Sequence, residues 1–103
     1  MQKDIQGKPL YFYVANLGSE IQRIFAWKEK NDNSAMKNAY YRANSLIEKI
    51  KNIASKNANV EICILQDLLK KFVIDGEQIL NRDQISNFFN PFALRITDKL
   101  FND

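Results

Sequence analysis

Apolar residues recur at helical spacing near the start of the chain. They follow one another at steps of four and three and would form one face of an α-helix: Leu10, Val14, Leu17, Ile21 and Ile24. The pattern predicts a helix that begins near Pro9, because proline is tolerated in a first helical turn. Gly18 interrupts the helix with a poor helix former, so we expect it to let a neighbouring helix approach closely.

Turn-forming residues are scarce in the rest of the chain, which contains three glycines and two prolines among 103 residues. An all-β sandwich or barrel of this length would need many more of them. Three further helices are predicted: one after the turn at Asn31–Ser34, one from about Val60 to Asp75, and one beyond Asn81. Asn81 and Gln84 form a variant of the capping box, in which each side chain bonds to the backbone of the other residue.

The predicted fold class is therefore all-α, a small antiparallel bundle of four main helices. The last helix should be bent or broken near Pro91, because proline has no backbone N–H to continue the helix. Residues 1–8 are predicted to be a loose N-terminal tail, and residues 9–103 a single helical-bundle domain.

The sequence offers few of the side chains that catalyse reactions or bind metal ions. The chain has no histidine, which removes the commonest general base and metal ligand. The acidic residues do not fall on the apolar stripes and are expected on solvated helix faces. Cys63, the single cysteine, lies between isoleucines and is expected to be a small core residue. We expect no enzymatic activity, no cofactor and no metal.

Two short stretches of the sequence bear on whether the protein is exported and whether it spans a membrane. The first residues are polar and lack the apolar segment of a signal peptide. The longest apolar run, residues 10–15, is far shorter than the ~20 residues that a membrane span needs. A single cysteine gives no internal disulfide. These features favour a cytoplasmic protein without a membrane segment.

Positive charge is concentrated in the first half of the chain. Residues 1–56 carry a net charge of +5, within a total of +3, and residues 34–56 alone carry +4. Basic residues interleaved with an aromatic are typical of a nucleic-acid-binding surface. One hypothesis is therefore an RNA- or DNA-binding accessory protein that uses the basic face of the second helix, at Lys37, Tyr41, Arg42, Lys49 and Lys51.

The preferred hypothesis is a non-enzymatic protein-interaction or accessory module, with self-association as one form of it. Large aromatic residues lie at the margins of the apolar stripes, and those that stay exposed would mark a protein partner's site. The expected interface residues are Trp27, Phe25, Phe12 and Phe89, of which Trp27 would be the anchor. Solvated basic surface without any ligand is the simpler alternative for the second helix.

Overall fold

In the residues that it describes, the computed structural model has four α-helices. It describes residues 7–76 and 81–102, with side chains to residue 96. The helices are α1 (Leu10–Glu29), α2 (Asn33–Ile53), α3 (Lys56–Val73) and α4 (Arg82–Asn102). The prediction of an all-α bundle with four main helices is confirmed. Residues 1–6 of the predicted tail lie outside the described residues.

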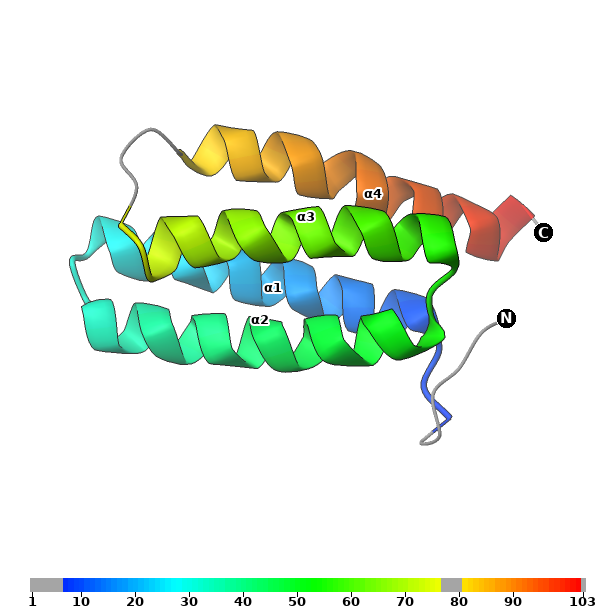
Figure 1. The fold of residues 1–103 in the computed structure, drawn as a ribbon, viewed down its shortest axis with the longest axis horizontal. Coiled ribbons are helices and arrows are strands. Elements are labelled where there is room, and N and C mark those ends of the chain that lie inside the picture. The colour runs from blue at the N-terminus through cyan, green and yellow to red at the C-terminus, as the bar shows by residue number, and fades with distance from the viewer. Residues whose placement is uncertain (1–6, 77–80, 103) are drawn as a thin grey trace.

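Each helix packs against two others, so that the four enclose one core. The most extensive contact is between α1 and α2; α3 packs on α2 and α4, and α4 packs on α1. Figure 1 shows the chain direction reversing from each helix to the next. Adjacent placement of α1 and α2 follows from their connection, which spans only residues 30–32.

The core consists of the apolar faces that the sequence pattern indicates. On α1, Val14, Leu17 and Ile24 are almost completely buried, as are Ile47 and Ile50 on α2. Comparable side chains from α3 and α4 complete the same cluster. Burial of these faces supplies most of the free energy that holds the helices together, because isolated helices of this length are only marginally stable in water.

Side-chain caps define the starts of three helices. Asp32 accepts a hydrogen bond from the N–H of Ala35 (3.0 Å), and Ser55 accepts one from the N–H of Ala58 (3.2 Å). Ser55 therefore starts α3 at Lys56, and the prediction of a start near Val60 is wrong.

The capping box predicted before the last helix is present. The N–H of Asn81 donates to Oε1 of Gln84 (2.8 Å), and the N–H of Gln84 donates to Oδ1 of Asn81 (2.9 Å). The helix then continues through Pro91 without interruption. The prediction of a break at Pro91 is wrong, while a bend there stays a prediction.

Gly18 provides the close approach expected of it, and the helix that approaches is α4. A Cβ atom at Gly18 would lie 3.1 and 3.3 Å from two ring carbons of Phe89. Phe89 is buried, and its ring lies over the α1 backbone where a side chain is missing. The contact explains why a glycine is found inside a 20-residue helix.

In the described part of the chain, no helix combines the length and the apolar character needed to span a bilayer.

Gly18→Leu should lower the free energy of unfolding by about 1–3 kcal/mol, because the added side chain must displace the Phe89 ring. Ala15→Leu is the matched control, since Ala15 is exposed one turn earlier on the same helix. We expect it to change stability by less than about 0.5 kcal/mol. Urea unfolding followed by circular dichroism measures both. Equal effects of the two substitutions would contradict the proposed Gly18–Phe89 packing.

Candidate functional site

Glu20 is a buried carboxylate on α1. The residue is 6% exposed, and it is the one buried polar or charged residue among those the structure describes. The expectation that the acidic residues lie on solvated faces is wrong for Glu20. Its Cα lies about 60° from that of Leu17 around the helix, close enough to the apolar stripe to turn toward a neighbouring helix.

Two arginines neutralise this carboxylate. Nη1 of Arg23, one turn later on α1, is 2.5 Å from Oε1 of Glu20. Nε of Arg42, on α2, is 2.9 Å from Oε2 and 3.1 Å from Oε1. A buried carboxylate needs such partners, because desolvation of an unpaired charge costs several kcal/mol. The Glu20–Arg42 pair thus joins α1 to α2 at a defined position.

A hollow of about 430 Å³ extends from this ion pair along the junction of α1 and α2. It is open to solvent on one side rather than enclosed. Its lining comes from one face of each helix, because the residues are spaced at three or four positions: Phe12, Tyr13, Asn16 and Glu20 on α1, and Arg42, Ser45, Leu46 and Lys49 on α2. We call this hollow the α1–α2 groove.

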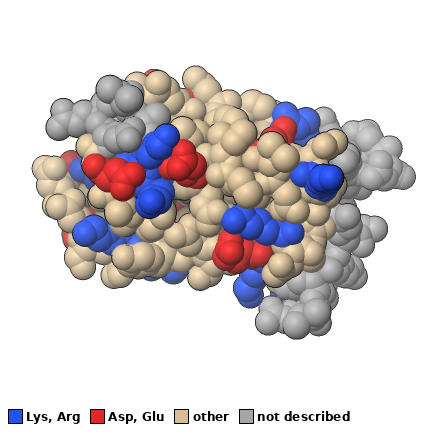
Figure 2. Space-filling model, in the orientation of Figure 1, with Lys and Arg blue, Asp and Glu red and all other residues tan. Residues whose placement is uncertain are grey.

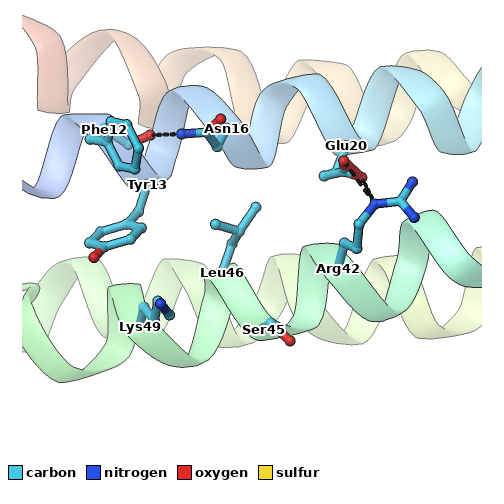
Figure 3. A pocket seen from close by; sticks show the side chains of 8 residues that line it. All are labelled: Phe12, Tyr13, Asn16, Glu20, Arg42, Ser45, Leu46 and Lys49. Carbon is cyan, nitrogen blue, oxygen red and sulfur yellow. Dashed lines mark hydrogen bonds and ion pairs between the residues drawn. The ribbon is translucent and has the colours of Figure 1, made fainter. Parts of the chain in front are cut away.

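The two ends of the α1–α2 groove differ (Figure 3). Glu20 and Arg42 lie together at one end, with the terminal nitrogens of Arg42 directed away from the other labelled residues. Tyr13 and Lys49 lie at the opposite end, and Nζ of Lys49 is 5.5 Å from the centroid of the Tyr13 ring. Leu46 provides an apolar surface between them. The groove therefore offers apolar contact flanked by two cations.

The predicted nucleic-acid residues are divided between different faces of α2. Arg42 and Lys49 line the α1–α2 groove. Lys51, two positions after Lys49 and thus about 160° away around the helix, is hydrogen-bonded to Gln66 of α3 (2.7 Å) and paired with Glu48. Lys37 is exposed, and Tyr41 is 57% exposed beside Tyr40. The five side chains do not share one face.

Charges on the face of the molecule drawn in Figure 2 are mixed. Lysine and arginine side chains lie in small groups beside aspartate and glutamate, and neutral surface separates the groups. This view, in which α3 is nearest the reader, shows no continuous basic patch on that face.

Two of the predicted interface residues belong to the core. Phe25 is 2% exposed and packs edge-on against Phe72, with 5.6 Å between ring centroids. Phe89 is buried against Gly18. Their expected exposure is wrong, because each ring fills space between helices that a single helix pattern does not reveal. Both are unavailable to a partner in the folded chain.

The other two predicted interface residues are at least partly accessible. Trp27 is half-buried against the core, with Nζ of Lys30 5.2 Å from its ring centroid. Phe12 is 39% exposed and lines the α1–α2 groove. Phe12 is therefore the predicted interface residue that the structure brings into a defined hollow.

Other candidate chemistry is sparse in the described residues. Cys63 is exposed, so its expected place in the core is wrong. No group of three or more His, Cys, Asp or Glu side chains that could hold a metal ion occurs in residues 7–76 and 81–96. Glu20 and Arg23 were missed by sequence reasoning. Their spacing of three is visible, but such pairs are common on solvated helix faces.

Comparison of the chain with protein families, curated proteins and solved structures found no match.

Removing the two arginines should cost more stability than removing the carboxylate. Arg23→Met with Arg42→Met leaves Glu20 buried without a cation, and we expect a loss of about 3–5 kcal/mol. Glu20→Leu leaves two arginines whose side chains are 55% and 52% exposed and can be hydrated, so the loss should stay below about 1 kcal/mol. Denaturant unfolding compares the two, and the reverse order would show that the carboxylate is not desolvated.

Proposed function

We propose that the protein is a non-enzymatic interaction module that binds a segment of a partner protein in the α1–α2 groove. The observation that carries this proposal is the combination of apolar surface, at exposed Phe12 and half-buried Leu46, with cations at both ends. Aromatic residues and arginine are the side chains most enriched at the energetic centres of protein interfaces. An acidic segment with apolar side chains complements such a groove.

The open shape of the groove supports a polypeptide ligand over a small molecule. Small-molecule sites bury most of the ligand surface, which an open hollow cannot do. The α1 residues that line the groove extend over eight positions from Phe12 to Glu20, or about 12 Å along the helix axis. A partner segment of about two helical turns would cover that length and could be held by further contacts outside the groove.

A non-enzymatic role is supported by the side chains that line the groove. Glu20 is the one lining carboxylate, and both its oxygens accept hydrogen bonds from arginine. A general base needs a free lone pair directed at the substrate. The chain also has no histidine that could serve instead.

Phe12→Ala and Leu46→Ala should each weaken capture of the partner from the native host by about tenfold, because each removes apolar contact area from the groove. Val60→Ala is the control, since Val60 is 59% exposed on α3 and outside the groove. Quantitative pull-down followed by binding measurements on the captured protein provides the test. A partner retained equally by all three variants would place its binding site elsewhere, and a second copy of this chain as the captured protein would mean self-association.

A second candidate function is binding of RNA or DNA through α2. The exposure of Tyr41 favours it, since an exposed aromatic ring near basic side chains can stack on a base. Phosphate contacts would come from Lys37, Arg42, Lys49 and Lys51. The division of these residues between faces of α2 makes this the weaker proposal.

Nucleic-acid binding would fall with salt, with a log–log slope of about −0.7 to −0.9 per neutralised phosphate. Charge reversal at Arg42 and Lys49 should weaken all sequences equally, because phosphate contacts carry no sequence information. Tyr41→Ala should cost about 1–3 kcal/mol of binding free energy. Filter binding at low salt that retains neither single-stranded RNA nor duplex DNA would exclude this function.

A further inference from the structure

Glu20 holds two guanidinium groups in place while leaving most of their donors unused. Arg23 and Arg42 both contact Oε1 of Glu20, although they come from different helices. Arg42 uses only Nε, and Arg23 uses only Nη1. In the described part of the chain, the other nitrogens of these two groups have no hydrogen-bond partner. Both side chains are more than half exposed.

We propose that Arg23 and Arg42 form an oxyanion site in which Glu20 is the positioning residue, and that the anion is a phosphate group on the partner segment bound in the α1–α2 groove. This inference rests on the proposed function. The three side chains carry a net charge of +1, so the cluster attracts an anion even though its carboxylate is negative. Arginine presents its donors in a fixed fork that matches phosphate and carboxylate oxygens.

A phosphate fits this arrangement better than a carboxylate. A phosphate monoester has three acceptor oxygens and a charge of about −1.5 to −2 at neutral pH, so it can bind both guanidinium groups at once. The shared contact with Glu20 means that little side-chain entropy is lost when the anion binds, because the buried carboxylate already restricts both arginines. A carboxylate ligand offers fewer acceptor oxygens and only one negative charge to the same guanidinium donors.

A single phosphate on a peptide is favoured over the phosphates of a nucleic acid. A polymer needs basic side chains that follow its backbone. Along the groove the next cation of α2, Lys49, lies about 10 Å farther along the helix and near the Tyr13 ring. Lys51 is engaged on the opposite side of α2. The oxyanion site is thus a localised one at the end of a groove.

The test is an NMR titration of the full chain with inorganic phosphate, with phosphoserine blocked at both termini, and with the corresponding unphosphorylated serine. We expect saturable shifts of the Arg23 and Arg42 side-chain N–H signals with the first two probes and none with the third. Arg42→Lys should weaken phosphoserine binding about tenfold, since lysine cannot replace the guanidinium fork. Arg95→Lys, at an equally exposed arginine paired with Glu61 on α3, is the matched control and should bind normally.

Glu20→Gln separates a positioned site from simple charge attraction. The substitution raises the local net charge, so simple attraction would strengthen phosphoserine binding. A positioned site binds more weakly, because the arginines lose the acceptor that orients them. Circular dichroism checks that each variant is folded. If Glu20→Gln does not fold, the comparison of Arg42→Lys with Arg95→Lys decides the proposal.

Three results would overturn the proposal: no saturable shift at the arginines, tighter binding by Glu20→Gln, or equal losses in Arg42→Lys and Arg95→Lys. A polymer ligand would be indicated by two results together. Single-stranded RNA would bind with a salt slope equal to several neutralised phosphates, and phosphoserine would bind with no higher affinity than acetate. This combination would also overturn the proposal. The proposed function is judged separately by Phe12→Ala and Leu46→Ala, whose effect on partner capture does not depend on phosphate.

Discussion

A carboxylate buried between two helices must be accompanied by cations, and this requirement defines how α1 and α2 meet. Glu20 is 6% exposed, and its oxygens are within 3.1 Å of donors from Arg23 and Arg42. Apolar faces attract each other without specifying one alignment, whereas an ion pair is satisfied only where its members face each other. The Glu20–Arg42 contact therefore favours the alignment of α1 and α2 in which these two residues face each other, and the α1–α2 groove begins at this contact.

The remaining helices depend on different contacts. Gly18 gives Phe89 of α4 a place against the α1 backbone, and Arg82 at the start of α4 is paired with Glu29 and lies 5.4 Å from the centroid of the Phe25 ring. These contacts hold α4 on the side of α1 where Gly18 lies. Among the described residues, those that line the α1–α2 groove come from α1 and α2, so α4 packs on α1 without contributing to it.

Local patterns in the sequence were sufficient for the helices but not for the contacts between them. The stripe through Leu17 and Ile21 and the capping box at Asn81 depend on neighbours within four positions, and both predictions are confirmed. The burial of Phe25, Phe89 and Glu20 depends on residues far away in the chain, and for these the expectations were wrong. The same reasoning applies to the site: Phe12 and Arg42 were identified singly, but their common groove and the role of Glu20 arise only from helix pairing.

Partner binding in the α1–α2 groove and the oxyanion site both depend on Glu20 and Arg42 interacting across the helix junction in solution. A double-mutant cycle of Glu20→Gln, Arg42→Met and the combined variant, measured by urea unfolding, tests this interaction most directly. We predict a coupling free energy of about 1–3 kcal/mol, because the two residues contact each other and share a partly desolvated site. Additive effects of the two substitutions, within about 0.5 kcal/mol, would contradict the pairing and with it the arrangement of the groove.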